Sequence, residues 1–291
     1  MAGLTAIRQD RTFMDSYGIA IHFYQWKAET PRAVVQLAHG LGEYACRHED
    51  VVERLVQAGY TVYADDHRGH GRTGLEQWGG DAKRLGRLGP GGLGATVDEV
   101  RQLTMIVRSE NPGLPLALLG HSWGSLMAQQ ILDEHGGDLD AVVLTGSAYR
   151  TLRHMNGGDL NKRHYRPGGT GYEWLSRDES VGAAFAADPL AFSARAVKLF
   201  GIADSLRLLG RPTRNPVADV PVLIQSGSDD PFGGARSVEL LARAYRERSR
   251  LSDVELIVYP DARHEIFKEL DGEQAMMDTI GWLDSRLAAG S

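Results

Sequence analysis

The sequence has little cysteine and no long hydrophobic run. Cys46 is the single cysteine among 291 residues, so an internal disulfide is excluded and the chain suits a reducing compartment. No run of 18 or more apolar residues occurs, and we therefore expect no transmembrane helix. The first residues also lack the charged stretch followed by an apolar stretch that a secretory signal needs. We expect a cytoplasmic protein.

An excess of basic residues is also missing. The sequence has 32 Lys and Arg against 38 Asp and Glu, which gives a formal net charge of -6. Nucleic-acid-binding domains usually show the opposite bias, so we expect no nucleic-acid partner. One basic cluster, at residues 162–166 (KRHYR), is followed by Pro-Gly-Gly, and we interpret it as a solvated loop.

Motifs for cofactors and metals are scarce. Residues 89–94 (GPGGLG) match the spacing of a dinucleotide-binding loop, but the apolar strand that this motif requires does not precede them. His264-Glu265 lacks the second histidine of a zinc-protease motif, and no cysteine–histidine cluster indicates a metal site. We therefore expect no cofactor and no metal.

Short apolar runs alternate with amphipathic stretches along most of the chain. Six apolar runs end in turn signals: 33–38, 60–64, 116–119, 141–144, 222–225 and 254–259. Helical patterns separate or follow them: 49–58, 96–109, 123–134, 237–248 and 274–288. This alternation predicts an α/β fold with a mostly parallel, twisted sheet flanked by helices. Residues 12–26, with Tyr-Gly at 17–18, predict an antiparallel hairpin at the sheet edge.

The alternation stops between residues 147 and 216. Gly, Arg and Asn are frequent at first, and residues 181–209 then look helical, with interruptions at Pro189 and Gly201. We predict an inserted, mainly helical cap at 147–216. Residues 1–146 and 217–291 would form the α/β core.

A G-x-S-x-G motif joins an apolar run to a helical pattern: Gly120-His121-Ser122-Trp123-Gly124. In this strand–turn–helix context the motif predicts the nucleophile elbow of an α/β-hydrolase. Glycine at 120 and 124 avoids collisions with the neighbouring strand and helix. The hydroxyl of Ser122 would then project above the sheet, with the positive end of the following helix directed at it.

A serine nucleophile needs a base, and an acid must orient that base. In this fold the acid and the histidine follow the serine in that order. Asp229 and Asp230 follow the apolar run 222–225, and His264 follows the run 254–259. Since ligands bind at the carboxyl ends of parallel strands, we predict His264 as the base and one of the two aspartates as the acid.

Acyl transfer also needs N–H donors for the oxyanion. We predict one at Trp123, the residue after the nucleophile, and one at Leu41, in the loop after the run 33–38. Glycine at 40 and 42 lets this loop turn its amides inward.

Five motifs in order resemble the monoacylglycerol lipase and lysophospholipase branch of the α/β-hydrolases: 39–44 (HGLGEY), 66–73 (DHRGHGRT), 120–125 (GHSWGS), 227–231 (GSDDP) and 264–269 (HEIFKE). The resemblance extends over residues 12–287 and includes 187–192 (ADPLAF) of the predicted cap. It implies an ester hydrolase that acts through an acyl-enzyme on monoacylglycerol-like or other small acyl esters.

The resemblance also implies residue roles. The family's acid falls on Asp230, its base on His264, and its oxyanion donors on Leu41 and Trp123. Residues implied to support the site are His39, Gly40, Gly42, Glu43, Arg47, Gly120, His121 and Gly124. The family usually has methionine where Trp123 stands and glycine where Ser125 stands. The larger ring is expected to change which acyl groups fit.

Other functions fit the same residues. A Ser-His-Asp triad also serves amide hydrolysis, thioester hydrolysis and perhydrolysis, and the fold occurs in ligand-binding receptors with weak turnover. The partners we expect are a small-molecule ester and, transiently, a membrane surface that the cap contacts. The sequence leaves the oligomeric state open.

Overall fold

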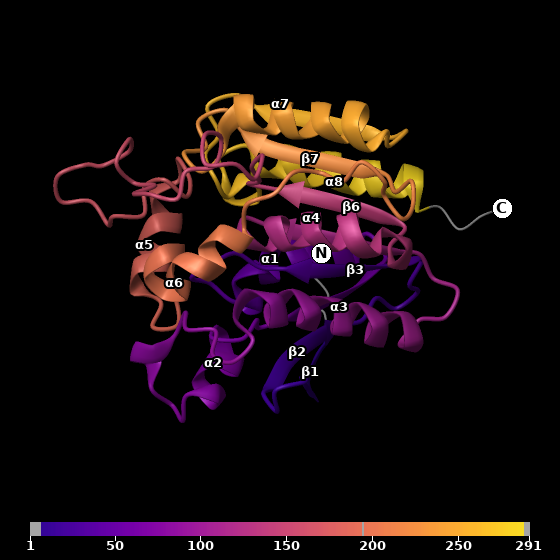
Figure 1. The fold of residues 1–291 in the computed structure, drawn as a ribbon, viewed down its shortest axis with the longest axis horizontal. Helices are drawn as coiled ribbons and strands as arrows, with labels where there is room; N and C mark the ends of the chain where they lie inside the picture. Colours follow the sequence, from indigo (N-terminus) through magenta and orange to yellow (C-terminus); the bar gives the residue numbers. More distant parts are fainter. Residues whose placement is uncertain (1–6, 194, 288–291) are drawn as a thin grey trace.

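One eight-stranded sheet organises the protein (Figure 1). A computed structural model describes residues 7–193 and 195–287 of the chain. The strands are β1 (Arg8–Met14), β2 (Ala20–Trp26), β3 (Ala33–Ala38), β4 (Tyr60–Asp65), β5 (Leu116–His121), β6 (Ala141–Thr145), β7 (Val222–Gly227) and β8 (Val254–Tyr259). Their order is β1-β2-β4-β3-β5-β6-β7-β8, antiparallel at the β1-β2 and β2-β4 pairs and parallel elsewhere. The predicted sheet and its edge hairpin are confirmed.

Helices follow the strands. The α-helices are α1 (Glu49–Gln57), α2 (Gly71–Gln77), α3 (Gly92–Glu110), α4 (Trp123–His135), α5 (Glu179–Ala187), α6 (Ala196–Arg207), α7 (Gly234–Ala244) and α8 (Gly272–Arg286). Shorter helical turns are η1 (Ala45–His48), η2 (Ala82–Arg84), η3 (Gly136–Asp138), η4 (Tyr245–Ser249) and η5 (Ile266–Lys268). Helix α2 was not predicted, and Ala288, the predicted last residue of α8, lies outside the described residues. Within the described ranges, no helix has both the length and the apolar character needed to cross a membrane.

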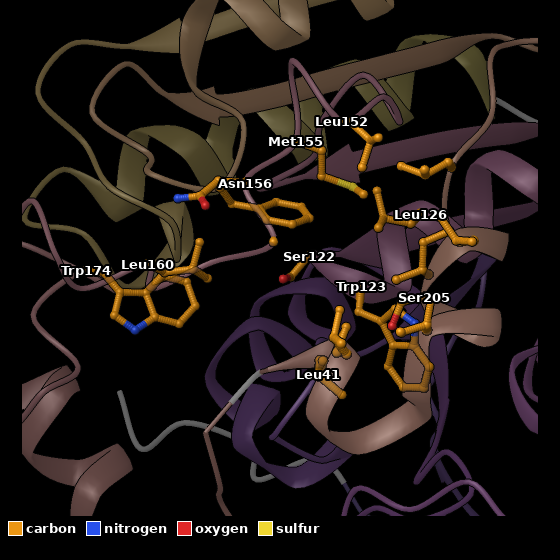
Figure 2. Close-up of a pocket in the computed structure, with 18 residues that line it drawn as sticks. Leu41, Ser122, Trp123, Leu126, Leu152, Met155, Asn156, Leu160, Trp174 and Ser205 are labelled. Atoms are coloured by element: carbon orange, nitrogen blue, oxygen red, sulfur yellow. The ribbon is translucent and has the colours of Figure 1, made fainter.

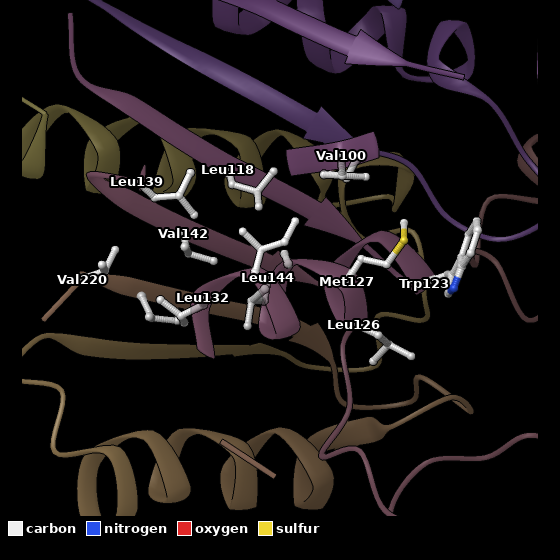
Figure 3. Close-up of a cluster of buried hydrophobic side chains, with 14 of the residues drawn as sticks. Val100, Leu118, Trp123, Leu126, Met127, Leu132, Leu139, Val142, Leu144 and Val220 are labelled. Carbon is white, nitrogen blue, oxygen red and sulfur yellow. The ribbon is translucent and has the colours of Figure 1, made fainter. Parts of the chain in front are cut away.

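The helices form two layers that bury both faces of the sheet. Leu116 and Leu118 of β5 pack with residues of α3, α4 and α7 on one face (Figure 3). Ala117 and Leu119 of the same strand pack with residues of α1 and α8 on the other face. Because both faces are covered, the central strands are continuous apolar runs rather than alternating ones.

A helical insertion lies between β6 and β7, beyond the carboxyl ends of the parallel strands (Figure 1). Its helix α5 ends just before Pro189, since the residue preceding a proline disfavours helical backbone. Helix α6 is broken at Gly201, which has a φ of 79°. Both interruptions were predicted from the sequence.

The exact limits of the insertion stay predictions. The boundaries proposed were 147–216 for the cap and 1–146 with 217–291 for the core, and of these residues 1–6, 194 and 288–291 lie outside the described chain. The basic cluster at 162–166, predicted as a solvated loop, forms a turn at 162–164 and irregular backbone at 165–166. It is mostly exposed, but the side chain of His164 is buried.

Close packing around the turn between β5 and α4 requires glycine. A Cβ atom added at Gly120 would lie 2.6 Å from the carbonyl oxygen of Gly124. One added at Gly124 would lie 2.1 Å from the carbonyl oxygen of Ala38. Any side chain at these two positions would therefore push β5, α4 and β3 apart.

We expect Gly124→Ala to lower the free energy of unfolding by at least about 2 kcal/mol, because the methyl group meets backbone that cannot move independently. Gly281→Ala is the matched control. Gly281 is exposed within α8, and an added Cβ there meets no described atom within 4 Å. This control should be neutral or stabilising by up to about 1 kcal/mol. Equilibrium urea unfolding measures both, and equal midpoints for the two variants would contradict the prediction.

Candidate active site

Ser122 lies at the tip of the sharp turn that joins β5 to α4. Its backbone has φ 53° and ψ -119°, a conformation that residues other than glycine rarely adopt. The N–H of Ser122 donates to the carbonyl oxygen of Thr145 at 2.9 Å, which ties the turn to the end of β6. The side chain is partly exposed and lines a pocket under the insertion.

The predicted oxyanion donors flank the same pocket. Leu41 and Trp123 both line it beside Ser122 (Figure 2). Trp123 is the first residue of α4, so its N–H has no partner within the helix. The N–H of Leu41 donates no hydrogen bond within the described part of the chain. A Cβ added at Gly40 would lie only 3.0 Å from the Cβ of Ser122, so this loop directly abuts the serine.

His264 and Asp230 form a buried pair. The Nδ1 atom of His264 lies 3.0 Å and 3.1 Å from the two carboxylate oxygens of Asp230. The Nε2 atom is buried and has no hydrogen-bond partner among the described residues. The imidazole ring lies 5.0 Å from the ring of His121, the neighbour of Ser122, and 4.8 Å from that of Trp174 in the pocket wall.

Asp229 and Asp230 have different surroundings. Asp229 forms an ion pair with Arg163 of the insertion, with 2.5 Å between the closest atoms, and lies 3.8 Å from His164. Asp230 lies against His264, and one of its oxygens accepts the N–H of Phe232 at 2.9 Å. The structure therefore brings Asp230 and not Asp229 to the imidazole.

Two opposing effects set the pKa of His264. Burial favours the neutral ring and lowers the pKa. The charge of Asp230 and its hydrogen bond, together with the charges of Glu265 and Glu43, outweigh burial and raise the pKa above the ordinary value. Neutral His264 therefore predominates only at pH values above this raised pKa.

A buried ionic network lies behind the serine. Glu43 accepts the N–H of Gly40 at 2.6 Å and lies 3.1 Å from the Nε2 atom of His48. Arg47 lies 3.5 Å from Glu43 and 3.2 Å from Glu265. Burial alone would raise the pKa of Glu43, but the nearby His48 and Arg47 hold it well below its usual range. Glu43 is therefore an anion whose charge is balanced inside the protein.

His121 is neutral within this network. Burial lowers its pKa to about 3, although Glu43 favours the charged form. Its Nδ1 atom lies 3.1 Å from the hydroxyl of Thr145. Sequence reasoning singled out Glu43, Arg47 and His121 but gave no role in the site to His48, which follows Arg47, or to Glu265, which follows His264.

The pocket above Ser122 is apolar. It encloses about 900 Å³, including its opening to solvent. The eighteen residues that line it include no Asp, Glu, Lys or Arg (Figure 2). Most of its wall comes from the insertion: Leu152, Met155, Asn156, Gly157, Leu160, Trp174, Ala196, Val197, Ile202, Ser205, Leu206, Leu208 and Leu209. None of these was predicted, because the sequence offered no motif for them.

In the described part of the chain, no three His, Cys, Asp or Glu side chains converge as a metal site. That the reaction uses no cofactor stays a prediction.

Comparison with known proteins identifies the family. Residues 29–271 match the Hydrolase_4 family, described as "Serine aminopeptidase, S33". The chain belongs to this family. It is 32% identical over 300 residues to a monoacylglycerol lipase of Mycolicibacterium smegmatis, covering 98% of this chain and all of the relative. It is 29% identical to the human monoglyceride lipase, covering 84% of this chain and 80% of the relative.

A solved structure supports the fold. The thermostable carboxyl esterase of Bacillus coagulans, in complex with glycerol, superimposes with a TM-score of 0.82 at 23% identity, covering 97% of this chain and all of the esterase. With the family match and the lipase relatives, the protein is a serine hydrolase of the monoacylglycerol lipase and esterase group.

We expect His264 of the hydrolase to titrate above 6.5, and Asp230→Asn to lower its pKa, because the substitution removes the largest of the charges that raise it. The Cε1–H resonance of His264, followed by NMR between about pH 5 and about pH 9, measures both values. Asp229→Asn is the matched control, since Asp229 faces Arg163, and it should leave this pKa in place. A shift caused by Asp229→Asn alone would reverse the assignment of the two aspartates.

Proposed function

We propose that the hydrolase cleaves neutral carboxylic esters, such as monoacylglycerols or other small acyl esters, through an acyl-enzyme. The observation that carries this proposal is the uncharged, apolar pocket that opens directly onto Ser122. Such a pocket favours an acyl chain beside the reacting carbonyl, because burying apolar surface is favourable and no charge there needs compensation.

In the proposed mechanism Ser122 attacks the ester carbonyl while Nε2 of His264 accepts its proton. The N–H groups of Leu41 and Trp123 stabilise the oxyanion, and Asp230 holds the imidazole and stabilises its charged form. His264 then gives the proton to the leaving alcohol. Water repeats the sequence on the acyl-enzyme and releases the acid. Because the base must be neutral, activity should fall as the pH drops below the raised pKa of His264.

The family's description makes amide hydrolysis the second candidate, because an aminopeptidase could use the same triad. An aminopeptidase must bind the charged α-amino group of its substrate next to the scissile bond, and a carboxylate is the usual partner for that charge. The eighteen residues around Ser122 offer no carboxylate. The pocket therefore favours esters over aminoacyl amides.

We further propose that the mouth of the pocket contacts lipid surfaces. Four large apolar side chains of the insertion line the pocket and remain exposed: Leu152 (81%), Val197 (54%), Ile202 (70%) and Leu206 (54%). Contiguous exposed apolar residues at a cavity entrance are typical of sites that bind membranes or ligands.

We expect Ser122→Ala to lose about 10³-fold or more of kcat on p-nitrophenyl esters, because it removes the nucleophile. Ser205→Ala is the matched control. Ser205 is a second serine in the same pocket, and its hydroxyl donates to the carbonyl oxygen of Gly201. This control should retain most of the activity.

Three outcomes would contradict the proposal. Higher activity on anilides than on esters would favour the amidase. Negligible turnover of every ester in a chain-length series would favour a receptor. Labelling of Ser125 or Ser147 rather than Ser122 by a phosphonate reagent would show a different nucleophile.

The pair Leu152→Ser and Ile202→Ser should weaken binding to phospholipid vesicles by about tenfold or more, because each side chain buries apolar surface in the lipid. Cosedimentation measures this binding. The rate on a short water-soluble ester should change less than about threefold, since the chemical step is untouched. Met277→Ser, at an exposed position of α8, is the control and should bind vesicles like wild type. A loss of rate on the soluble ester as large as the loss of vesicle binding would indicate damage to the pocket instead.

A further inference from the structure

The peptide unit between Gly40 and Leu41 carries the proposed oxyanion donor of the loop 39–44. The N–H of Leu41 belongs to the same peptide unit as the carbonyl of Gly40. Peptide units in the described chain are trans, so this N–H and this C=O point in opposite directions. A contact that fixes the carbonyl of Gly40 therefore also fixes the direction of the N–H of Leu41.

His39 makes that contact. Its Nδ1 atom lies 2.7 Å from the carbonyl oxygen of Gly40. Its Nε2 atom accepts the backbone N–H of His67 at 3.1 Å. An imidazole nitrogen that accepts an N–H carries no proton, so the proton of neutral His39 lies on Nδ1, where it is donated to Gly40. The hydrogen bonds thus select one tautomer.

The surroundings of His39 keep the ring neutral and immobile. Its side chain is fully buried, and its ring stacks on that of His67 with 3.9 Å between centroids. Burial, with the neighbouring His67 and His70, lowers the pKa of His39 well below its ordinary value. The donor on Nδ1 is therefore held in one direction.

Two other peptide units of this loop are also held, the one before this unit and the one two units after it. The N–H of Gly40 donates to Glu43 at 2.6 Å, and the carbonyl oxygen of Gly42 accepts the N–H of Phe192 from the insertion at 2.9 Å. Among these contacts, only the bond from His39 acts on the unit that contains the N–H of Leu41.

We propose that His39 is a positioning residue, whose Nδ1–H holds the carbonyl of Gly40 and thereby directs the N–H of Leu41 at the oxyanion. The inference rests on the proposed function, since it requires that Leu41 supplies an oxyanion donor. His39 itself touches no reacting atom. Its contribution should be confined to the transition state, because the oxyanion forms only there.

Two substitutions test the hydrogen bonds of the two ring nitrogens of His39 separately. In His39→Asn, the side-chain amide can occupy the Nδ1 position and donate to Gly40, while the acceptor for His67 is lost. In His39→Gln, the amide reaches the Nε2 position and can accept from His67, while the donor to Gly40 is lost. Both substitutions remove the ring stacking, so each controls for the other.

We expect His39→Gln to lower kcat on p-nitrophenyl butyrate by about 10- to 100-fold with little change in KM, because a misdirected donor costs a fraction of the 10²–10³ that a missing one costs. His39→Asn should stay within about threefold of wild type. Rates are expressed per active site, counted by complete labelling with a fluorescent phosphonate. A trifluoromethyl ketone should bind His39→Gln more weakly than His39→Asn. Equal kcat losses in the two variants would overturn the inference.

A measurement on the wild-type protein covers the case in which a variant does not fold. Long-range ¹H–¹⁵N NMR of histidine-labelled protein should find neutral His39 with its proton on Nδ1 at neutral pH. A proton on Nε2, or a charged ring, would overturn the inference. Wild type that hydrolyses no ester would overturn the proposed function together with the inference. Active wild type with equally impaired variants would overturn the inference alone.

Discussion

The backbone of Ser122 is the constraint on which the arrangement of the site depends. A non-glycine residue at φ 53° and ψ -119° stores about 1–3 kcal/mol, which the surrounding structure must offset. A fully buried strand precedes the turn, and a helix whose first half is buried follows it. The hydroxyl projects into the pocket only while β3, β5 and α4 stay in close contact, and glycine at 120 and 124 permits that contact. The core of the sheet therefore holds the strain that exposes the serine.

The polar groups behind the serine extend this rigidity to the loop 39–44, which carries the proposed oxyanion donor Leu41. Burying an anion such as Glu43 is costly unless neighbouring cations and donors compensate it. Here the charge of Arg47 balances that of Glu43, and one carboxylate oxygen lies within hydrogen-bond distance of both the N–H of Gly40 and Nε2 of His48. The carboxylate cannot move without leaving these groups unsatisfied in a medium of low dielectric. The ionic network therefore fixes the loop by making every alternative position of Glu43 unfavourable.

The sequence predicted the core of the site better than its walls. Strands buried on both faces appear in the sequence as continuous apolar runs. The turn motifs that follow these runs place Ser122 and His264 at the carboxyl ends of the parallel strands. From the residues alone, Asp229 and Asp230 were equivalent. Their difference arises because Arg163, far away in the chain, lies against Asp229. Trp174 and the apolar pocket wall were missed because the insertion lacks the periodicity that a regular sheet imposes.

The insertion is joined to the loop 39–44 as well as to the pocket. The N–H of Phe192 donates to Gly42, and the hydroxyl of Tyr44 donates to Asp188 at 2.9 Å. The guanidinium of Arg47 lies 4.5 Å from the centre of the Phe185 ring. Displacing the segment from α5 to Phe192 would therefore remove contacts from the loop that carries Leu41. Helix α6 meets the pocket mainly through apolar side chains, but its Asp204 accepts the N–H of Leu93 at 3.2 Å and so ties this helix to the start of α3. The insertion is therefore held on both sides of the pocket, at the loop 39–44 by the segment from α5 to Phe192 and at α3 by α6.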